Sequence, residues 1–159
     1  MSTSSGLTRI PKNTYGTNYD NSLLEQYKLY SQSADQISNR RATANNFLLS
    51  VNTSIVVIFS FFSGQIDPIK SKMFFLLPIV GILICIIWIV LLKSYKELNS
   101  AKFKCIHEIE NLLPLAPYSR EWEIVKESKT YKPFTFARVE PAIAIVFLLL
   151  YITLLAFRT

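Results

Sequence analysis

The sequence predicts an all-α membrane protein with three transmembrane helices and long cytoplasmic helical extensions. Half of the 159 residues are apolar, although the chain carries a formal charge of +6. The apolar residues lie in three uncharged blocks, at 46–63, 73–92 and 141–157. Because a helix needs about 20 apolar residues to cross about 30 Å of hydrocarbon, the second block qualifies outright and the others marginally. The shorter blocks could instead be buried helices, but a globule of this length has little room to bury three such segments.

The positions of the basic residues predict the orientation. Of 17 Lys and Arg residues, five precede the first span and nine lie between residues 93 and 138. These two segments share one side of a three-span chain, and the positive-inside rule makes that side the cytoplasm. Residues 1–22 contain no apolar signal-peptide core, so we expect the first span to be retained. The sequence thus predicts a membrane protein with its N-terminus in the cytoplasm and its C-terminus outside. Since topology explains the basic charge, no nucleic-acid contact is predicted.

The predicted organisation follows from composition and helix punctuation. It consists of a mobile N-terminal tail (1–20), a cytoplasmic amphipathic helix (21–44), the first span (45–63), a periplasmic link (64–72), the second span (73–92), a cytoplasmic helical stalk and interfacial segment (93–139), and the third span with a short outer tail (140–159). The second span and its stalk are predicted as one helix, from Met73 to Leu113. Ser119 is the predicted cap of a short helix, and Glu140 with Pro141 is predicted to open the third span.

The cytoplasmic amphipathic helix carries a seam of apolar residues at alternating spacings of four and three. The seam consists of Leu23, Tyr27, Tyr30, Ala34 and Ile37. Such a seam pairs with a second copy in an oligomer, or it lies on its own protein or on lipid headgroups. The pattern leaves both interpretations open.

The first span has a polar face on an arc roughly 160° wide. The candidate residues of this face are Asn45, Asn52, Thr53, Ser60 and Ser63. Amide and hydroxyl groups in hydrocarbon cost free energy unless they find partners. The face is therefore predicted either to pack on other helices by close approach and hydrogen bonding, or to line a conduit formed by several copies. Aromatic residues at the ends of the other spans are predicted interface anchors, namely Trp88, Tyr95, Trp122 and Phe134.

The sequence offers no catalytic or metal-binding pattern. His107 is the single histidine, and its acidic neighbours point to different helix faces. No serine sits in a nucleophile-elbow motif, and the four glycines form no phosphate loop. Cys85 and Cys105 lie on one predicted helix about 30 Å apart, so reduced thiols are expected. We therefore predict a non-enzymatic protein without cofactor, metal or catalytic residues.

Several polar stretches resemble a known family. They include Leu24-Glu-Gln-Tyr-Lys-Leu-Tyr30, the run from Ala34 to Arg41, Ser94-Tyr-Lys-Glu-Leu-Asn-Ser-Ala-Lys-Phe-Lys104 and Leu113-Pro-Leu-Ala-Pro-Tyr118. Over about residues 22–158 the chain resembles the small bacterial inner-membrane proteins of the RipA family. The resemblance implies a ring-like homo-oligomer, an octamer, with no catalytic residues to carry over. It also implies a link to growth inside host cells and to envelope homeostasis.

The expected function is that of a regulated, membrane-perturbing effector of pore type in a bacterial defence or stress system. Small multi-span proteins of similar build act in antiphage defence, which is an analogy of architecture. The alternative is a membrane scaffold for envelope homeostasis or host adaptation that does not conduct. The expected partners are the lipid bilayer, further copies of the chain and a cytoplasmic regulatory partner.

Overall fold

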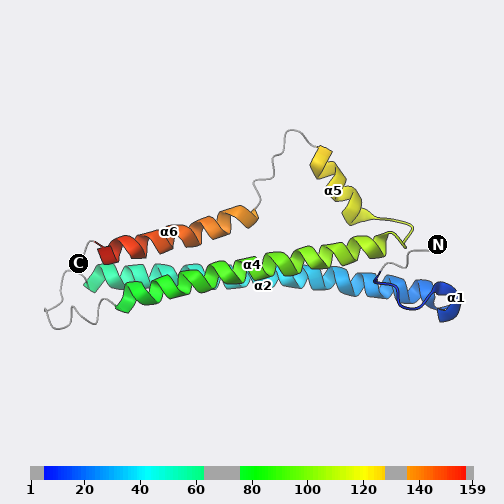
Figure 1. Cartoon of the computed structure of the whole chain (residues 1–159), viewed down its shortest axis with the longest axis horizontal. Coiled ribbons are helices and arrows are strands. Elements are labelled where there is room, and N and C mark those ends of the chain that lie inside the picture. Colours follow the sequence, from blue (N-terminus) through cyan, green and yellow to red (C-terminus); the bar gives the residue numbers. More distant parts are fainter. Residues whose placement is uncertain (1–5, 63–75, 128–135, 157–159) are drawn as a thin grey trace. The chain divides into compact units, whose positions relative to one another are not determined.

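The computed structural model describes residues 6–62, 76–127 and 136–156. The regular structure in these ranges is helical throughout: α1 (Lys12–Tyr15), α2 (Tyr19–Phe62), α4 (Leu76–Glu110), α5 (Pro117–Glu127) and α6 (Phe136–Ala156) (Figure 1). Helices α2, α4 and α6 are each long and apolar enough to cross a membrane. The predicted class, an all-α protein with three spans, is thereby confirmed.

The chain divides into two compact units. The polar unit comprises residues 1–39 and 97–133, and the apolar unit comprises residues 40–96 and 134–159. Helices α2 and α4 contribute one end to each unit, whereas α5 belongs to the polar unit and α6 to the apolar unit.

Helix α2 is 44 residues long because its sequence contains neither proline nor glycine. Gly16 ends α1 just upstream with a φ of 92°, which a residue without Cβ adopts readily. A Lys12–Asp20 ion pair of 2.7 Å and a Tyr15–Ser22 hydrogen bond join this segment to the start of α2. The stretch predicted as a mobile tail therefore contains local structure that its composition does not indicate.

Three predicted helix boundaries are corrected. Helix α4 ends at Glu110, three residues before the predicted end at Leu113. The next residues form tighter turns, in which the N–H groups of Leu112 and Leu113 each donate to the carbonyl three residues earlier. Helix α5 begins at Pro117, which suits the first helical position, so Ser119 is its third residue and not its cap. Helix α6 already begins at Phe136, and Pro141 lies inside it.

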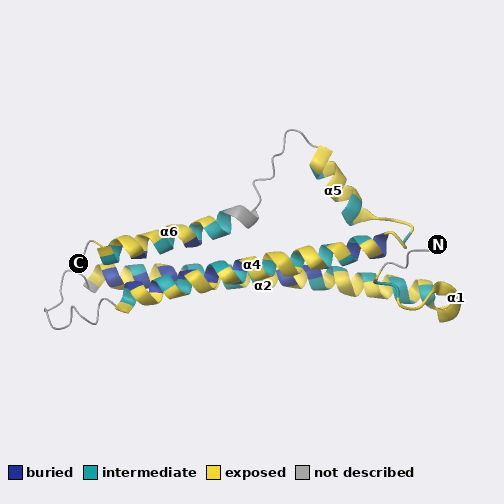
Figure 2. Cartoon of the chain, viewed as in Figure 1, coloured by how far each residue is buried: buried dark blue, intermediate teal, exposed yellow. Residues whose placement is uncertain are grey.

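The core of the apolar unit forms where α2, α4 and α6 pack together. Ile55, Cys85 and Tyr151 make one buried cluster, and a second contains Trp88, Leu92 and Ala144. Figure 2 shows buried positions, in dark blue, recurring along α2 and α4. A Cβ added at Gly81 would lie 2.5 Å from the Tyr151 ring, so the absence of a side chain is what lets this ring pack on α4.

The outer surfaces of α4 and α6 in the apolar unit consist of bulky aliphatic side chains. On α4 these are Ile79, Val80, Leu83, Ile86, Ile87 and Val90, and on α6 they are Ile145, Val146, Leu149 and Ile152. Exposed aliphatic surface of this extent marks contact with lipid or with another protein surface, and its length suits the hydrocarbon of a membrane.

Candidate functional site

The polar residues of the first span separate into two groups in the structure. Asn52 is fully buried and Asn45 is half-buried within the apolar unit, whereas Thr53 and Ser60 are exposed on α2. Ser63 lies outside the described residues. The single polar arc of the sequence thus becomes an inward pair of amides and an outward set of hydroxyls.

Asn52 connects all three spans. Its Nδ2 donates to the Leu48 carbonyl over 2.8 Å, and its Oδ1 accepts from the Cys85 thiol over 3.3 Å. Its backbone carbonyl accepts the Tyr151 hydroxyl over 3.1 Å. Because each polar group has a partner inside the chain, Asn52 acts as an interhelical contact, which is one of the two roles the sequence left open for it.

Asn45 is bonded by Trp88, which the sequence predicts to lie at the membrane interface. The Trp88 Nε1–H donates to Asn45 Oδ1 over 3.1 Å, and the Trp88 ring is fully buried with its centroid 6.4 Å from that of Phe147. An interface anchor must present its ring to the headgroups, so the prediction for Trp88 is wrong. The indole instead fills the core and satisfies an amide in the span.

The remaining predicted anchors lie in different environments. Tyr95 is half-buried on α4. Trp122 is 54% exposed on α5, with Lys126 Nζ 5.6 Å from its ring centroid. Phe134 lies outside the described residues. Whether Tyr95 and Trp122 contact headgroups stays a prediction.

Exposed hydroxyls form what we term the hydroxyl face of α2, consisting of Ser50, Thr53, Ser54 and Ser60. All four are exposed, and each donates to the carbonyl four residues earlier over 2.8–2.9 Å. This back-bonding satisfies the hydroxyl proton of each residue within the helix. The face is therefore stable inside a membrane while remaining more polar than its surroundings.

A shielded ion pair joins α2 to α6 in the apolar unit. Arg41 donates through Nε to Glu140 over 2.8 Å and through a second guanidinium nitrogen to the same oxygen, and both side chains are 18% exposed. The sequence predicts that Glu140 opens the third span. The structure corrects this interpretation, because Glu140 lies inside α6 and pairs with a cation on another helix.

In the polar unit the predicted oligomer seam is largely occupied by contacts within the chain. Ala34 and Ile37 are buried, while Leu23 and Tyr27 are half-buried. Tyr30 is 36% exposed, and Lys102 of α4 lies 4.8 Å from its ring centroid. Lys102 also donates to Ser33 over 2.7 Å. The seam therefore lies on α4 of its own chain.

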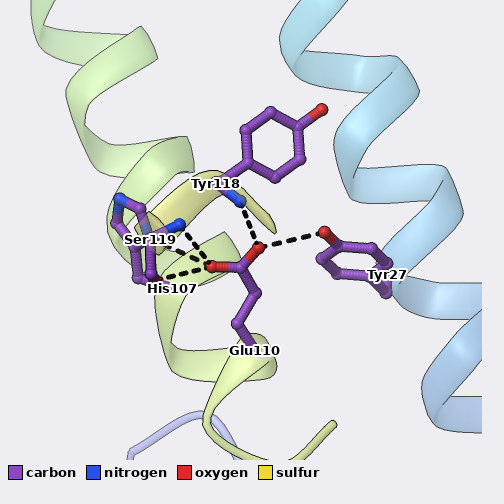
Figure 3. A network of polar contacts seen from close by, with 5 residues as sticks. All are labelled: Tyr27, His107, Glu110, Tyr118 and Ser119. Atoms are coloured by element: carbon purple, nitrogen blue, oxygen red, sulfur yellow. Dashed lines mark hydrogen bonds and ion pairs between the residues drawn. The ribbon is translucent and has the colours of Figure 1, made fainter. Parts of the chain in front are cut away.

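Glu110, at the end of α4, is the centre of a polar network that the sequence did not reveal (Figure 3). The residue is 1% exposed. Its Oε1 accepts from the Tyr118 N–H over 2.8 Å and from the Tyr27 hydroxyl over 3.1 Å. Its Oε2 accepts from the Ser119 N–H over 2.9 Å and the Ser119 hydroxyl over 2.6 Å. The carboxylate thus caps the first turn of α5 and ties it to α2.

The network perturbs the ionisation of two groups. Burial acts to raise the pKa of Glu110, but the hydrogen bonds from Ser119, Tyr118 and Tyr27 outweigh it and hold the pKa below its ordinary value of 4.5. Burial raises the pKa of Tyr27 to about 12, and the hydrogen bond to Glu110 and the charge of that carboxylate act in the same direction. At neutral pH the pair is therefore a carboxylate and a neutral phenol.

His107 completes the cluster without forming a catalytic triad. Its Nδ1 lies 2.8 Å from Ser119 Oγ and 3.4 Å from Glu110 Oε2. Since Ser119 donates its proton to Glu110, its oxygen accepts from His107 Nδ1–H. A triad needs the serine and the acid on opposite ring nitrogens, whereas here both face Nδ1. The arrangement therefore suits a structural cap, and no set of three or more His, Cys, Asp or Glu residues in the described ranges is placed to hold a metal ion.

The fold and the polar contacts between its spans define an integral membrane protein of the all-α class. Over residues 24–159 the chain matches the octameric membrane protein family (8xMP). The chain belongs to this family, and the match supports a ring-like homo-oligomer. No curated protein and no solved structure matches the chain.

Proposed function

We propose that this protein is a non-enzymatic, homo-oligomeric inner-membrane effector that perturbs the membrane by forming a regulated pore. The hydroxyl face of α2 is the observation that carries the proposal. In the apolar unit, the exposed surfaces of α4 and α6 are largely aliphatic, whereas this face of α2 presents four hydroxyls beside the exposed side chains of Val57 and Phe61. Facing another copy or water costs less free energy than facing lipid, because hydrocarbon offers no hydrogen-bonding partner.

The chain belongs to an octameric family, so further copies of the chain are available to contact the hydroxyl face. Repeated around an axis, the face lines either a packed contact or, after rearrangement, a narrow aqueous path. Hydroxyls without formal charge favour weak ion selectivity. Asn45 and Asn52 are not part of this lining, since both are engaged inside their own chain.

The setting of this activity follows from the charge distribution. The positive-inside rule favours a cytoplasmic polar unit and an external C-terminus. A regulatory partner in the cytoplasm would therefore act on the polar unit. We further propose that the protein is a RipA-type member of the octameric family and that it acts in bacterial defence or stress.

Cellular membrane potential tests the pore. A Thr53→Val, Ser60→Ala double substitution removes two hydroxyls with little change in volume. When wild type and variant are each expressed with the neighbouring genes, we expect the variant to depolarise cells at least about ten-fold less. The matched control is Thr153→Val, because Thr153 is an exposed hydroxyl on α6 that bonds back to the Leu150 carbonyl. Equal depolarisation by all three proteins would contradict the pore.

A scaffold without conduction is the second candidate. The Asn52 contacts and the Arg41–Glu140 pair favour it, since they fix the three spans within each copy. A scaffold predicts an intact oligomer that leaves the membrane potential unchanged under every condition, while loss of the oligomer still abolishes the phenotype. Measuring potential and native mass on the same variants separates the two candidates.

A further inference from the structure

A cavity in the polar unit lies between the start of α2 and the end of α4. It encloses about 270 Å³. Its apolar lining comes from three segments: Leu7 and Ile10 of the N-terminal stretch, Leu23 of α2, and Ile109 and Leu112 at the end of α4. The rings of Tyr15 and Tyr19 complete this wall, packed edge to face with centroids 5.8 Å apart. Such a lining suits an aromatic or aliphatic body.

The charge around the cavity is one-sided. Arg9 lines it and brings a permanent positive charge, whereas no acidic residue is among its lining residues. Asp20, which follows Tyr19 in the chain, is held by Lys12 over 2.7 Å. Gln26 adds an amide to the rim. A guanidinium beside an apolar wall binds carboxylate and phosphate groups well, because it offers several donors in one plane.

We propose that this cavity binds a small, soluble, amphipathic anion, with an aromatic or aliphatic body among the apolar residues and a carboxylate or phosphate at Arg9. A volume of about 270 Å³ suits a small molecule better than a two-chain lipid. The same anionic group occurs on lipid headgroups, so the experiment includes a lipid arm.

Both helices that line the cavity, α2 and α4, also carry residues of the Glu110 network. Ile109 precedes Glu110 and Leu112 lies in the turn after it, while Leu23 and Gln26 lie one helical turn or less before Tyr27. A ligand that contacts both walls therefore sets the separation that the Tyr27–Glu110 hydrogen bond requires. If the proposed function holds, this cavity is where a chemical trigger would act, but the binding itself does not depend on conduction.

Binding is tested on the full-length protein in phosphatidylcholine nanodiscs by saturation-transfer NMR. The probes are phenyl phosphate, its neutral counterpart benzyl alcohol, and inorganic phosphate. We expect saturation transfer to phenyl phosphate and little to the other two. Arg9→Gln should raise the dissociation constant of phenyl phosphate about ten-fold. The matched control Arg120→Gln removes an exposed arginine of the same unit that does not line the cavity, and should leave it unchanged.

A second variant keeps the test independent of Arg9. Leu112→Trp places a larger ring in the cavity at a position that is 44% exposed, so we expect a folded protein that no longer binds. Nanodiscs containing phosphatidylglycerol form the lipid arm. If that lipid competes with phenyl phosphate, the ligand of the cavity is a lipid headgroup and not a soluble anion. Absence of saturation transfer, equal binding of benzyl alcohol, or unchanged binding in Arg9→Gln would overturn the proposal. A failed depolarisation assay alone would leave it standing.

Discussion

A single carboxylate decides how three segments of the polar unit meet. Glu110 is almost fully buried, yet it accepts four hydrogen bonds from Tyr27, Tyr118 and Ser119. A buried charge is costly unless its lone pairs are satisfied, and here donors from α2 and from the first turn of α5 satisfy them. The position therefore requires an acceptor with two oxygens.

Glu110→Gln tests this requirement at the residue scale. Its amide NH₂ would face backbone donors, so we expect a loss of about 1–3 kcal/mol of stability at pH 7, measured by thermal unfolding in detergent. Because the pKa of Glu110 is lowered on folding, its contribution is complete above its ordinary value of 4.5 and disappears as the pH falls through the lowered pKa.

The pH dependence provides the check on Glu110. The stability difference between wild type and Glu110→Gln should shrink below pH 4.5. The control Glu121→Gln alters an exposed acid of α5 and should have no comparable effect. A difference that stays constant into acid would contradict a charged Glu110.

The contact of Tyr151 with Gly81 gives a second prediction at this scale. Gly81→Ala would push a methyl group into the ring and break the Tyr151–Asn52 hydrogen bond, at a cost of about 1–3 kcal/mol. Tyr151→Phe removes the same hydrogen bond alone. The two losses should therefore be less than additive in a double-mutant cycle of thermal stability. Additive losses would show that Gly81 does not position the ring.

Among the helices, α5 is held differently from the rest of its unit. Within Pro117–Glu127 no residue is buried, and the contacts described between α5 and other elements involve Tyr118 and Ser119 of its first turn. The long helices α2, α4 and α6 each bury residues along their length, whereas the four-residue α1 buries none. Helix α5 is thus docked at one end, and Glu110 provides most of that docking.

The Arg41–Glu140 pair tests the association of α2 with α6. Arg41→Leu leaves a poorly solvated carboxylate, so we expect a loss of about 3 kcal/mol in thermal unfolding in detergent. The exchanged pair Arg41→Glu, Glu140→Arg should recover a substantial part of that loss. Failure of the exchange to recover any stability, with Arg40→Leu equally harmful, would contradict a specific ion pair.

At the scale of the whole molecule, the sequence predicts the spans but not their orientations about their own axes. Hydropathy and helix length are local properties, so the spans and the continuous α2 helix follow from residue order. The division between Asn52 and Thr53 depends on where α4 and α6 lie, which no local pattern contains. Trp88 was assigned by its place near the end of a span, yet it faces Asn45, 43 positions away.

The candidate site shows the same limit. The donors to Glu110 come from positions 83 residues before it and 8 and 9 residues after it. A glutamate beside the apolar positions Ile106 and Ile109 was the one available signal, and the charge pattern of a solvated helix face masks it. By contrast, polar composition alone indicated the hydroxyls of the first span, because such groups are unusual in a transmembrane helix.

A pore requires the hydroxyl face to meet another copy of the chain, and cysteine crosslinking in native membranes tests this contact most directly. Thr53→Cys, in a Cys105→Ser background, places a thiol on the face, and Thr153→Cys places one on the outer surface of α6. The buried Cys85 remains in both proteins as an internal reference. We expect oxidation to crosslink Thr53→Cys into dimers and to leave Thr153→Cys monomeric. Crosslinking of Thr153→Cys with none at Thr53→Cys would contradict it.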